Sequence, residues 1–155
     1  IRTLVFLLLA IGSSFSALAY PLDTARLQPK PVFGKEVRVV TYLLDNHHFR
    51  RLKFSDSLSS VVYERYFGEL DPSRLYFLQS DLKRFDSYRL KLDDLSRTEN
   101  VTPAFAIYAL FQDRYRVRLN YVINNLVGKE FDYTTDEYYE VDRDSLPWAA
   151  SNEEL

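Results

Sequence analysis

The stretch TPAFAIYALFQDRYRVRLNYVINNLVG, residues 102–128, decides the fold class. Thr102 can cap a helix, Pro103 suits its first turn, and Gly128 is typical of a helix end. The stretch is apolar on two sides, so we expect a long central helix with other helices packed around it. One apolar line is Phe105, Tyr108, Tyr115, Leu119, Val122 and Leu126, and the other is Ile107, Phe111, Arg114, Val117 and Tyr121.

Three more helices are predicted before this one. The first covers roughly residues 35–49, the second follows FSDS and ends at Asp71-Pro72, and the third starts with Ser80 as its N-cap. The expected inner positions are Val37, Val40, Thr41 and Leu44 in the first helix, Leu58, Val61, Val62, Arg65 and Tyr66 in the second, and Leu82, Phe85, Tyr88, Leu92 and Leu95 in the third. The predicted fold is therefore all-α, an irregular helical domain of about four helices.

The composition supports one globular domain. The 155 residues are 46% hydrophobic and 15% aromatic, so the chain can form a real core, and only four are glycine, which argues against a sandwich or barrel rich in tight turns. Cysteine is absent, which excludes disulfides, zinc thiolate sites and cysteine nucleophiles. The mixed charges of the body argue against a nucleic-acid partner.

The N-terminus has the features of an export signal. Arg2 precedes an apolar run, and Ala17-Leu18-Ala19 forms an A-x-A cleavage site, so residues 1–19 are interpreted as a signal peptide cleaved before Tyr20. The alternative is a buried N-terminal helix. Residues 20–34 are expected to form an extended leader, and residues 35–155 the helical domain. This organisation predicts a periplasmic protein.

No group of residues predicts an active site. His47 and His48 are adjacent, so on a helix they point in different directions and do not match the i, i+4 spacing of a metal site. Ser87 and Lys91 have a spacing common on helix surfaces, and Thr102 in the sequon at Asn100 fits better as a helix cap. We therefore expect no catalytic, cofactor-binding or metal-binding residue and no cofactor.

The segment FDYTTDEYYEVDRDSLPW, residues 131–148, combines six carboxylates with five large aromatic residues. A calcium loop, a disordered acidic tail and an ordered strap are the three interpretations. A calcium loop needs a glycine that the segment lacks, and a disordered tail should be poor in aromatic residues. The strap is favoured, with its rings buried and its acids near basic residues of the body. The expected anchors and partners are Arg114, Arg118, Phe131, Tyr133, Tyr138, Tyr139, Asp142, Arg143, Asp144, Pro147 and Trp148.

Three stretches together carry a family resemblance. They are ERYFGELDPSRLYFLQSDLKRF (64–85), YALFQDRYRVRLNYVINNL (108–126) and FDYTTDEYYEVDRDSLPWAASNEEL (131–155). Their L-D-x-S…L-x-S-D, R-x-x-x-R and D-R-x-x-x-P-W elements resemble, in order and spacing, the N-terminal region of the bacterial tail-specific proteases, also called carboxy-terminal processing proteases. The resemblance covers about residues 35–155.

The resemblance implies a non-catalytic helical domain that shapes the substrate-receiving bowl of an exported serine endopeptidase. In this family the catalytic serine and lysine and the PDZ domain follow later in the chain, and substrates present nonpolar C-termini. Ser151, Glu153 and Glu154 suggest a further helix, so the chain is expected to continue past Leu155. Implied partners are those downstream domains, protein substrates and a periplasmic adaptor. The alternative is a stand-alone periplasmic helical adaptor or chaperone-like binding module.

Overall fold

The computed structural model describes residues 26–155, so the expected signal peptide and its cleavage site lie outside the described residues. Five α-helices follow one another: α1 (Pro31–His47), α2 (Asp56–Leu70), α3 (Gln79–Phe85), α4 (Leu92–Arg97) and α5 (Thr102–Asn125). Two short 3₁₀ turns, η1 (Asp86–Tyr88) and η2 (Arg143–Ser145), complete the list. The all-α prediction is confirmed, because the described part of the chain contains no β-strand.

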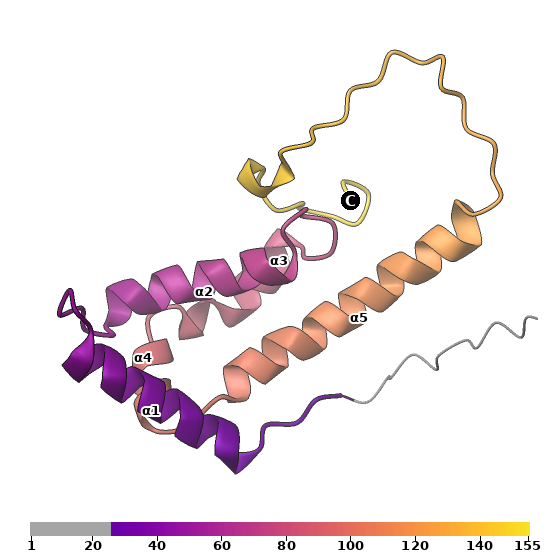
Figure 1. Ribbon diagram of the computed structural model, residues 1–155. Coiled ribbons are helices and arrows are strands. Elements are labelled where there is room, and N and C mark those ends of the chain that lie inside the picture. Colours follow the sequence, from indigo (N-terminus) through magenta and orange to yellow (C-terminus); the bar gives the residue numbers. More distant parts are fainter. Residues whose placement is uncertain (1–25) are drawn as a thin grey trace, which may run out of the picture.

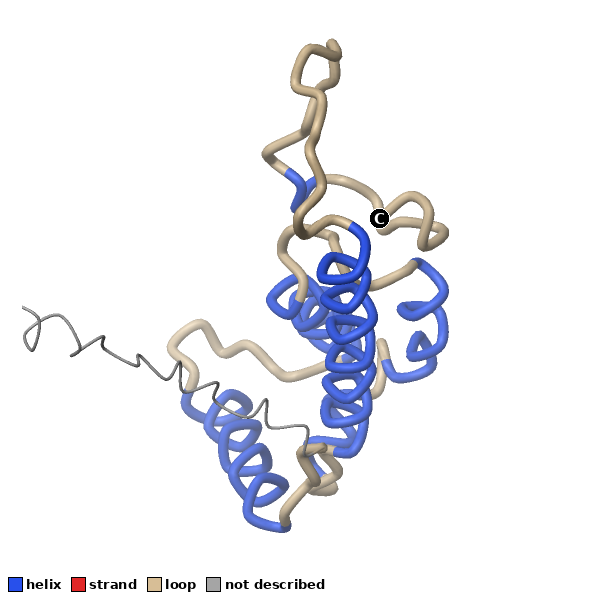
Figure 2. Tube along the Cα trace, turned by 90° about the vertical axis from the view of Figure 1, so that its right-hand side faces the viewer, coloured by secondary structure: helices blue, strands red, loops and turns tan. Residues whose placement is uncertain are grey.

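The short helix α4 packs against both α1 and α2 and joins them. Figure 1 shows α5 starting near this junction and running towards the C-terminal segment, which returns to the end of α2. Residues 129–142 form a long loop between α5 and η2 that arches away from the helices in both views (Figures 1 and 2).

The core is built mainly from aromatic rings. Tyr63, Phe67, Phe77, Phe85 and Ile107 are buried, and they come from α2, α3, α5 and the segment between α2 and α3. Phe67 and Phe77 meet edge to face at 4.9 Å, a geometry that aromatic pairs prefer. The core therefore sits where α2 faces α3 and the first half of α5.

The predicted inner face of α2 is only partly right, because Tyr66 packs against the core but Arg65 is exposed. Val61 and Val62 are exposed, whereas Ser59, Tyr63 and Phe67 are buried at i, i+4 and i+8. The two rings bury more apolar area than valines would, so they decide which way the helix is turned. Ser59 can share this face because its hydroxyl is paired with Asp93.

The third predicted helix is broken into α3, η1 and α4. Ser80 lies inside α3, and Leu78 takes the N-cap position. The Leu78 N–H, which the helix cannot satisfy, donates instead to Asp81 Oδ2 at 2.9 Å. Around η1, the backbone N–H groups of Arg89 and Lys91 donate to the carbonyl oxygens three residues earlier in the chain. The chain therefore turns more tightly there than in an α-helix.

The helix α1 begins at Pro31, four residues before the predicted start, because proline suits the first helical turn. Of its expected inner positions Thr41 is buried, whereas Val40 is exposed. Gly34 lies against the backbone of Glu99, and a Cβ atom there would sit 2.2 Å from the Glu99 carbonyl oxygen. The absence of a side chain therefore permits the close approach of α1 to the connection between α4 and α5.

The ends of α5 lie close to the predicted ones. Thr102 is the first helical residue, with Val101 as the N-cap, and the last helical residue is Asn125. Gly128 has φ +79°, a left-handed conformation that glycine adopts without strain.

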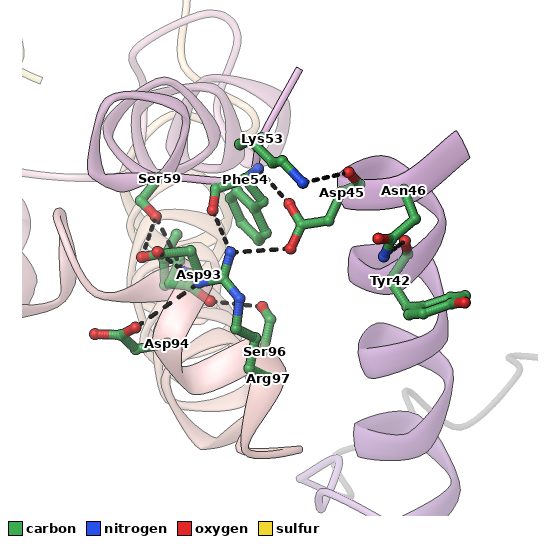
Figure 3. A network of polar contacts seen from close by, with 11 residues as sticks. Tyr42, Asp45, Asn46, Lys53, Phe54, Ser59, Asp93, Asp94, Ser96 and Arg97 are labelled. Atoms are coloured by element: carbon green, nitrogen blue, oxygen red, sulfur yellow. Dashed lines mark hydrogen bonds and ion pairs between the residues drawn. The ribbon is translucent and has the colours of Figure 1, made fainter. Parts of the chain in front are cut away.

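A polar network fixes α1 to α2 and α4 (Figure 3). Arg97 donates to Asp93 Oδ2 at 2.8 Å and to Asp45 Oδ2 at 3.1 Å, and it also donates to the Phe54 carbonyl oxygen. The Phe54 N–H donates to Asp45 Oδ1 at 2.8 Å, and Ser59 Oγ donates to Asp93 Oδ1 at 2.9 Å. One guanidinium thus joins residues from three parts of the chain.

Candidate functional site

The candidate functional site is the surface on which the C-terminal segment, residues 143–155, docks. The first residue that shapes this surface is Asp71, which follows the last residue of α2 and is completely buried. The Asp71 carboxylate accepts hydrogen bonds from the N–H groups of Leu75, Tyr76 and Phe77, each at 2.8–2.9 Å. These bonds hold the segment after Pro72 in one conformation and direct Phe77 into the core.

Trp148 is the main anchor of the C-terminal segment. Its ring meets Phe77 at 6.0 Å and Phe67 at 6.5 Å, both edge to face, and it is half-buried. The Arg74 guanidinium lies over the indole at 3.6 Å from the ring centre, which is a cation–π contact. The indole is therefore held between the aromatic core and a cation.

Backbone hydrogen bonds fix the register of the docked segment. Gln79 N–H donates to the Ala149 carbonyl oxygen at 2.9 Å, next to an isolated parallel bridge between Leu78 and Ala149. Arg74 donates to the Asp144 carbonyl oxygen at 2.9 Å, and Arg143 Nε donates to the Ser73 carbonyl oxygen at 2.8 Å. Because most of these contacts use the backbone, the sequence pattern alone could not show them.

The remaining predicted strap residues make fewer contacts with the body. Asp142, Asp144 and Pro147 are exposed. A hydrogen bond with Asp144 raises the pKa of the Asp142 carboxyl above its usual value. Neither carboxylate forms an ion pair with Arg114 or Arg118, the arginines of α5 that we expected as their partners.

The structure gives those arginines other partners. Arg114 makes a two-pronged ion pair with Asp81, with Nε–Oδ2 and Nη2–Oδ1 distances of 2.8 Å. Arg118 donates to the Leu155 carbonyl oxygen. The sequence interpretation missed Asp81, although an acidic residue three positions after Leu78 is typical of a helix N-terminus.

Four of the five aromatic residues that we expected to anchor the strap are not buried, so this part of the strap prediction is wrong. Phe131, Tyr133, Tyr138 and Tyr139 are exposed, the extreme case being Tyr138 with 93% of its surface accessible. Only Trp148 reaches the core, because it is also the only one flanked by backbone pairing to the body. The contacts between the strap and the body are thus confined to residues 143–155.

A cavity of about 550 Å³ separates the last turns of α5 from the C-terminal residues. Its walls include Tyr76, Arg118, Tyr121, Leu126 and Asn152. Arginine and tyrosine side chains could hold a polar or aromatic group there, but the cavity contains no nucleophile next to a base.

The residues considered for catalysis are dispersed. His47 contacts the Tyr42 ring, His48 contacts Phe49, and Ser87 and Lys91 are exposed. Within residues 26–155 no group of three or more histidine, cysteine or acidic side chains could hold a metal ion. None of the helices in the described part of the chain is long and apolar enough to cross a membrane.

The fold and site therefore define a small all-α domain whose C-terminal segment is clamped onto the junction of α2 and α3. Residues 39–155 match the family model described as the tail specific protease N-terminal domain. The chain is 32% identical over 105 residues to the tail-specific protease of Haemophilus influenzae. The aligned residues make up 67% of this chain and 15% of that protein. The chain belongs to the family of tail-specific protease N-terminal domains.

Proposed function

We propose that this chain is the non-catalytic helical scaffold of an exported tail-specific serine endopeptidase and that it helps to enclose the substrate. The chain spans about 15% of the length of the curated relative that it matches, so the rest of such a protein has ample room for a catalytic unit. In the parent protein a serine nucleophile with a neutral lysine base would cleave substrates that present nonpolar C-termini.

The observation that carries this proposal is the uncovered apolar surface on the second half of α5. Val117 and Tyr121 lie one turn apart on α5 and are both exposed, and so are Ile123 on the same helix and Val127 just after its end. Several exposed apolar side chains concentrated at one end of a helix are typical of a surface that binds another protein surface. A protease core in the same chain, or an unfolded substrate beside it, would bury them.

The proposal includes the other partners and the location of the parent protein. A PDZ domain and a protease domain of the same chain would contact this scaffold, and a periplasmic adaptor could bind its outer surface. Export through a signal peptide would place the protein in the periplasm. Mass spectrometry of the periplasmic protein should then find Tyr20 as the mature N-terminus, and material that keeps residues 1–19 would refute this part.

Activity measurements test the scaffold role. The purified chain should not hydrolyse unfolded proteins with apolar C-termini, whereas the parent protein should. In the parent, the paired change Val117→Ser and Tyr121→Ser should slow degradation of protein substrates more than cleavage of a short peptide. The matched control is Val61→Ser and Tyr42→Ser, an exposed valine on α2 and an exposed tyrosine on α1. Turnover by the chain itself that survives removal of contaminating proteases would overturn the proposal.

A further inference from the structure

Residues 129–142 form an acidic–aromatic loop whose every residue is exposed. The loop contains six carboxylates and one basic residue, Lys129, so its net charge is −5. None of these carboxylates forms an ion pair with any residue that the structure describes. Four aromatic rings lie between the charges: Phe131, Tyr133, Tyr138 and Tyr139. The loop thus offers unpaired negative charge and unburied apolar area on the same short segment.

The outer face of α1 offers the opposite combination. It is formed by Val32, Val39, Val40 and Leu43, all exposed and turned away from the buried residues Gly34 and Thr41. Four exposed basic residues frame these side chains: Lys30 and Lys35 near the start of the helix, and Arg50 and Arg51 beyond its end.

The positive charge of this face is also uncompensated. Lys30, Lys35, Arg50 and Arg51 form no ion pair within residues 26–155. The helix contains two acidic residues, of which Asp45 is paired with Arg97, so Glu36 is the one acidic side chain left to oppose the four bases. The α1 outer face is therefore apolar at its centre and basic at both ends.

The two surfaces cannot meet within one molecule in this fold. The acidic–aromatic loop lies at the top of both views and α1 lies at the bottom, with α2 and α5 between them (Figures 1 and 2). Complementary surfaces at opposite ends of one chain can be satisfied together by a second copy of that chain.

We propose that the chain self-associates, with the acidic–aromatic loop of each copy docked on the α1 outer face of the other. The rings of the loop cover the valines and Leu43, and its carboxylates face the four basic residues. In a two-fold symmetric pair the contact between the loop of one copy and the α1 outer face of the other forms twice, so both surfaces of each copy are covered. This inference does not depend on the proposed function.

Sedimentation velocity across a range of concentrations and salt tests the association. We expect dimers at low salt and weaker association as salt is raised, because exposed charges are screened. Asp136→Lys with Glu137→Lys in the loop should weaken dimerisation about tenfold or more, and so should Arg50→Glu with Arg51→Glu. The matched control is Glu69→Lys with Asp94→Lys, two exposed acidic residues outside both surfaces, which should leave it unchanged.

Mixing the two reversed variants gives the decisive measurement. The two introduced lysines in the loop of one variant should pair with the two introduced glutamates beyond α1 of the other, and the remaining wild-type surfaces also match, so the mixture should dimerise again. A protein that stays monomeric at low salt overturns the proposal. So does a dimer that the loop change leaves intact, or a mixture that does not recover. Circular dichroism of each variant should show unchanged helix content, which separates loss of docking from loss of folding.

Discussion

At the scale of single residues, Asp71 and Trp148 show how the C-terminal segment is held against the helices. Asp71 has no exposed surface and uses its carboxylate to accept three backbone N–H groups, which shapes the floor of the site. The Trp148 indole packs against Phe77 on one side, and the Arg74 guanidinium lies over its ring. The buried carboxylate thus acts on the backbone, and the indole supplies the apolar contact area.

Trp148→Ala should lower the free energy of unfolding by about 2 kcal/mol. Truncation of a fully buried tryptophan costs about 3–5 kcal/mol, and this indole is only half-buried. Urea unfolding followed by circular dichroism measures the change. Tyr138→Ala is the matched control, because its ring is exposed in the loop and its loss should cost less than about 0.5 kcal/mol. Equal effects of the two substitutions would contradict the anchoring role of Trp148.

At the scale of helices, close approach and paired charge decide how α1 and α3 are held. Gly34 lets α1 touch the backbone at Glu99, and Arg38 adds an ion pair with the Glu99 side chain at 3.0 Å. Arg114 joins α5 to the buried Asp81 at the start of α3. Each contact connects parts of the chain that are far apart in the sequence.

Gly34→Ala should destabilise the fold by about 1–3 kcal/mol, because the added methyl group would overlap the Glu99 carbonyl oxygen and push α1 away. Gly68→Ala is the matched control. Gly68 also lies in a helix, a Cβ there meets nothing within 4 Å, and alanine favours helix by about 1 kcal/mol. Thermal unfolding of both variants should therefore show opposite shifts of Tm. A stabilised Gly34→Ala variant would show that the two segments are not in contact.

Arg114→Ala should cost about 3 kcal/mol, because it leaves the Asp81 carboxylate, only 8% exposed, without its cation. Exposed ion pairs, in contrast, contribute about 0–1 kcal/mol. Arg65→Ala, which removes an exposed pair with Glu69, is the matched control in the same urea titration. In the double variant Arg114→Ala with Asp81→Asn, part of the lost stability should return because no unpaired charge is left. A loss no larger than in the control would mean that water reaches Asp81.

At the scale of the whole molecule, the network around Arg97 holds the helices together through charge. A hydrogen bond from the Phe54 N–H, with help from Arg97, lowers the pKa of Asp45. Burial alone would raise the pKa of Asp93, but hydrogen bonds from Arg97 and Ser59 outweigh it, so this pKa is lowered too. Both carboxylates are therefore bound to their partners in the charged form.

These lowered pKa values predict acid sensitivity. An unfolded aspartate has a pKa of about 3.9, so below that pH the unfolded chain binds protons that the folded one does not. The stabilisation is complete above about pH 5, where the unfolded aspartates are charged as well, and it is lost as the pH falls through the folded-state pKa values. Urea unfolding at a series of pH values measures this loss. Asp93→Asn should be less stable at neutral pH and should lose less on acidification, and an unchanged acid slope would contradict the prediction.

The sequence by itself determined the helical class and most helix positions. Regular apolar spacing, proline at the start of α5 and glycine after its end act locally, within a turn or two, and so can be read along the chain. The D-R-x-x-x-P-W element also pointed to an ordered C-terminal segment, and its Trp148 is the ring that packs on the core.

Only the tertiary structure decided which faces are buried and which charges pair. Tyr63 and Phe67 turn α2 away from the predicted valine face, because the aromatic residues they meet on α3 and before it come from elsewhere in the chain. Arg114 could have paired with any nearby acid, and the position of α3 selects Asp81 over the acidic loop. The sequence shows that the loop is acidic and aromatic, but it cannot show that residues 129–142 lie beyond the reach of the core, because burial depends on the packing of distant segments.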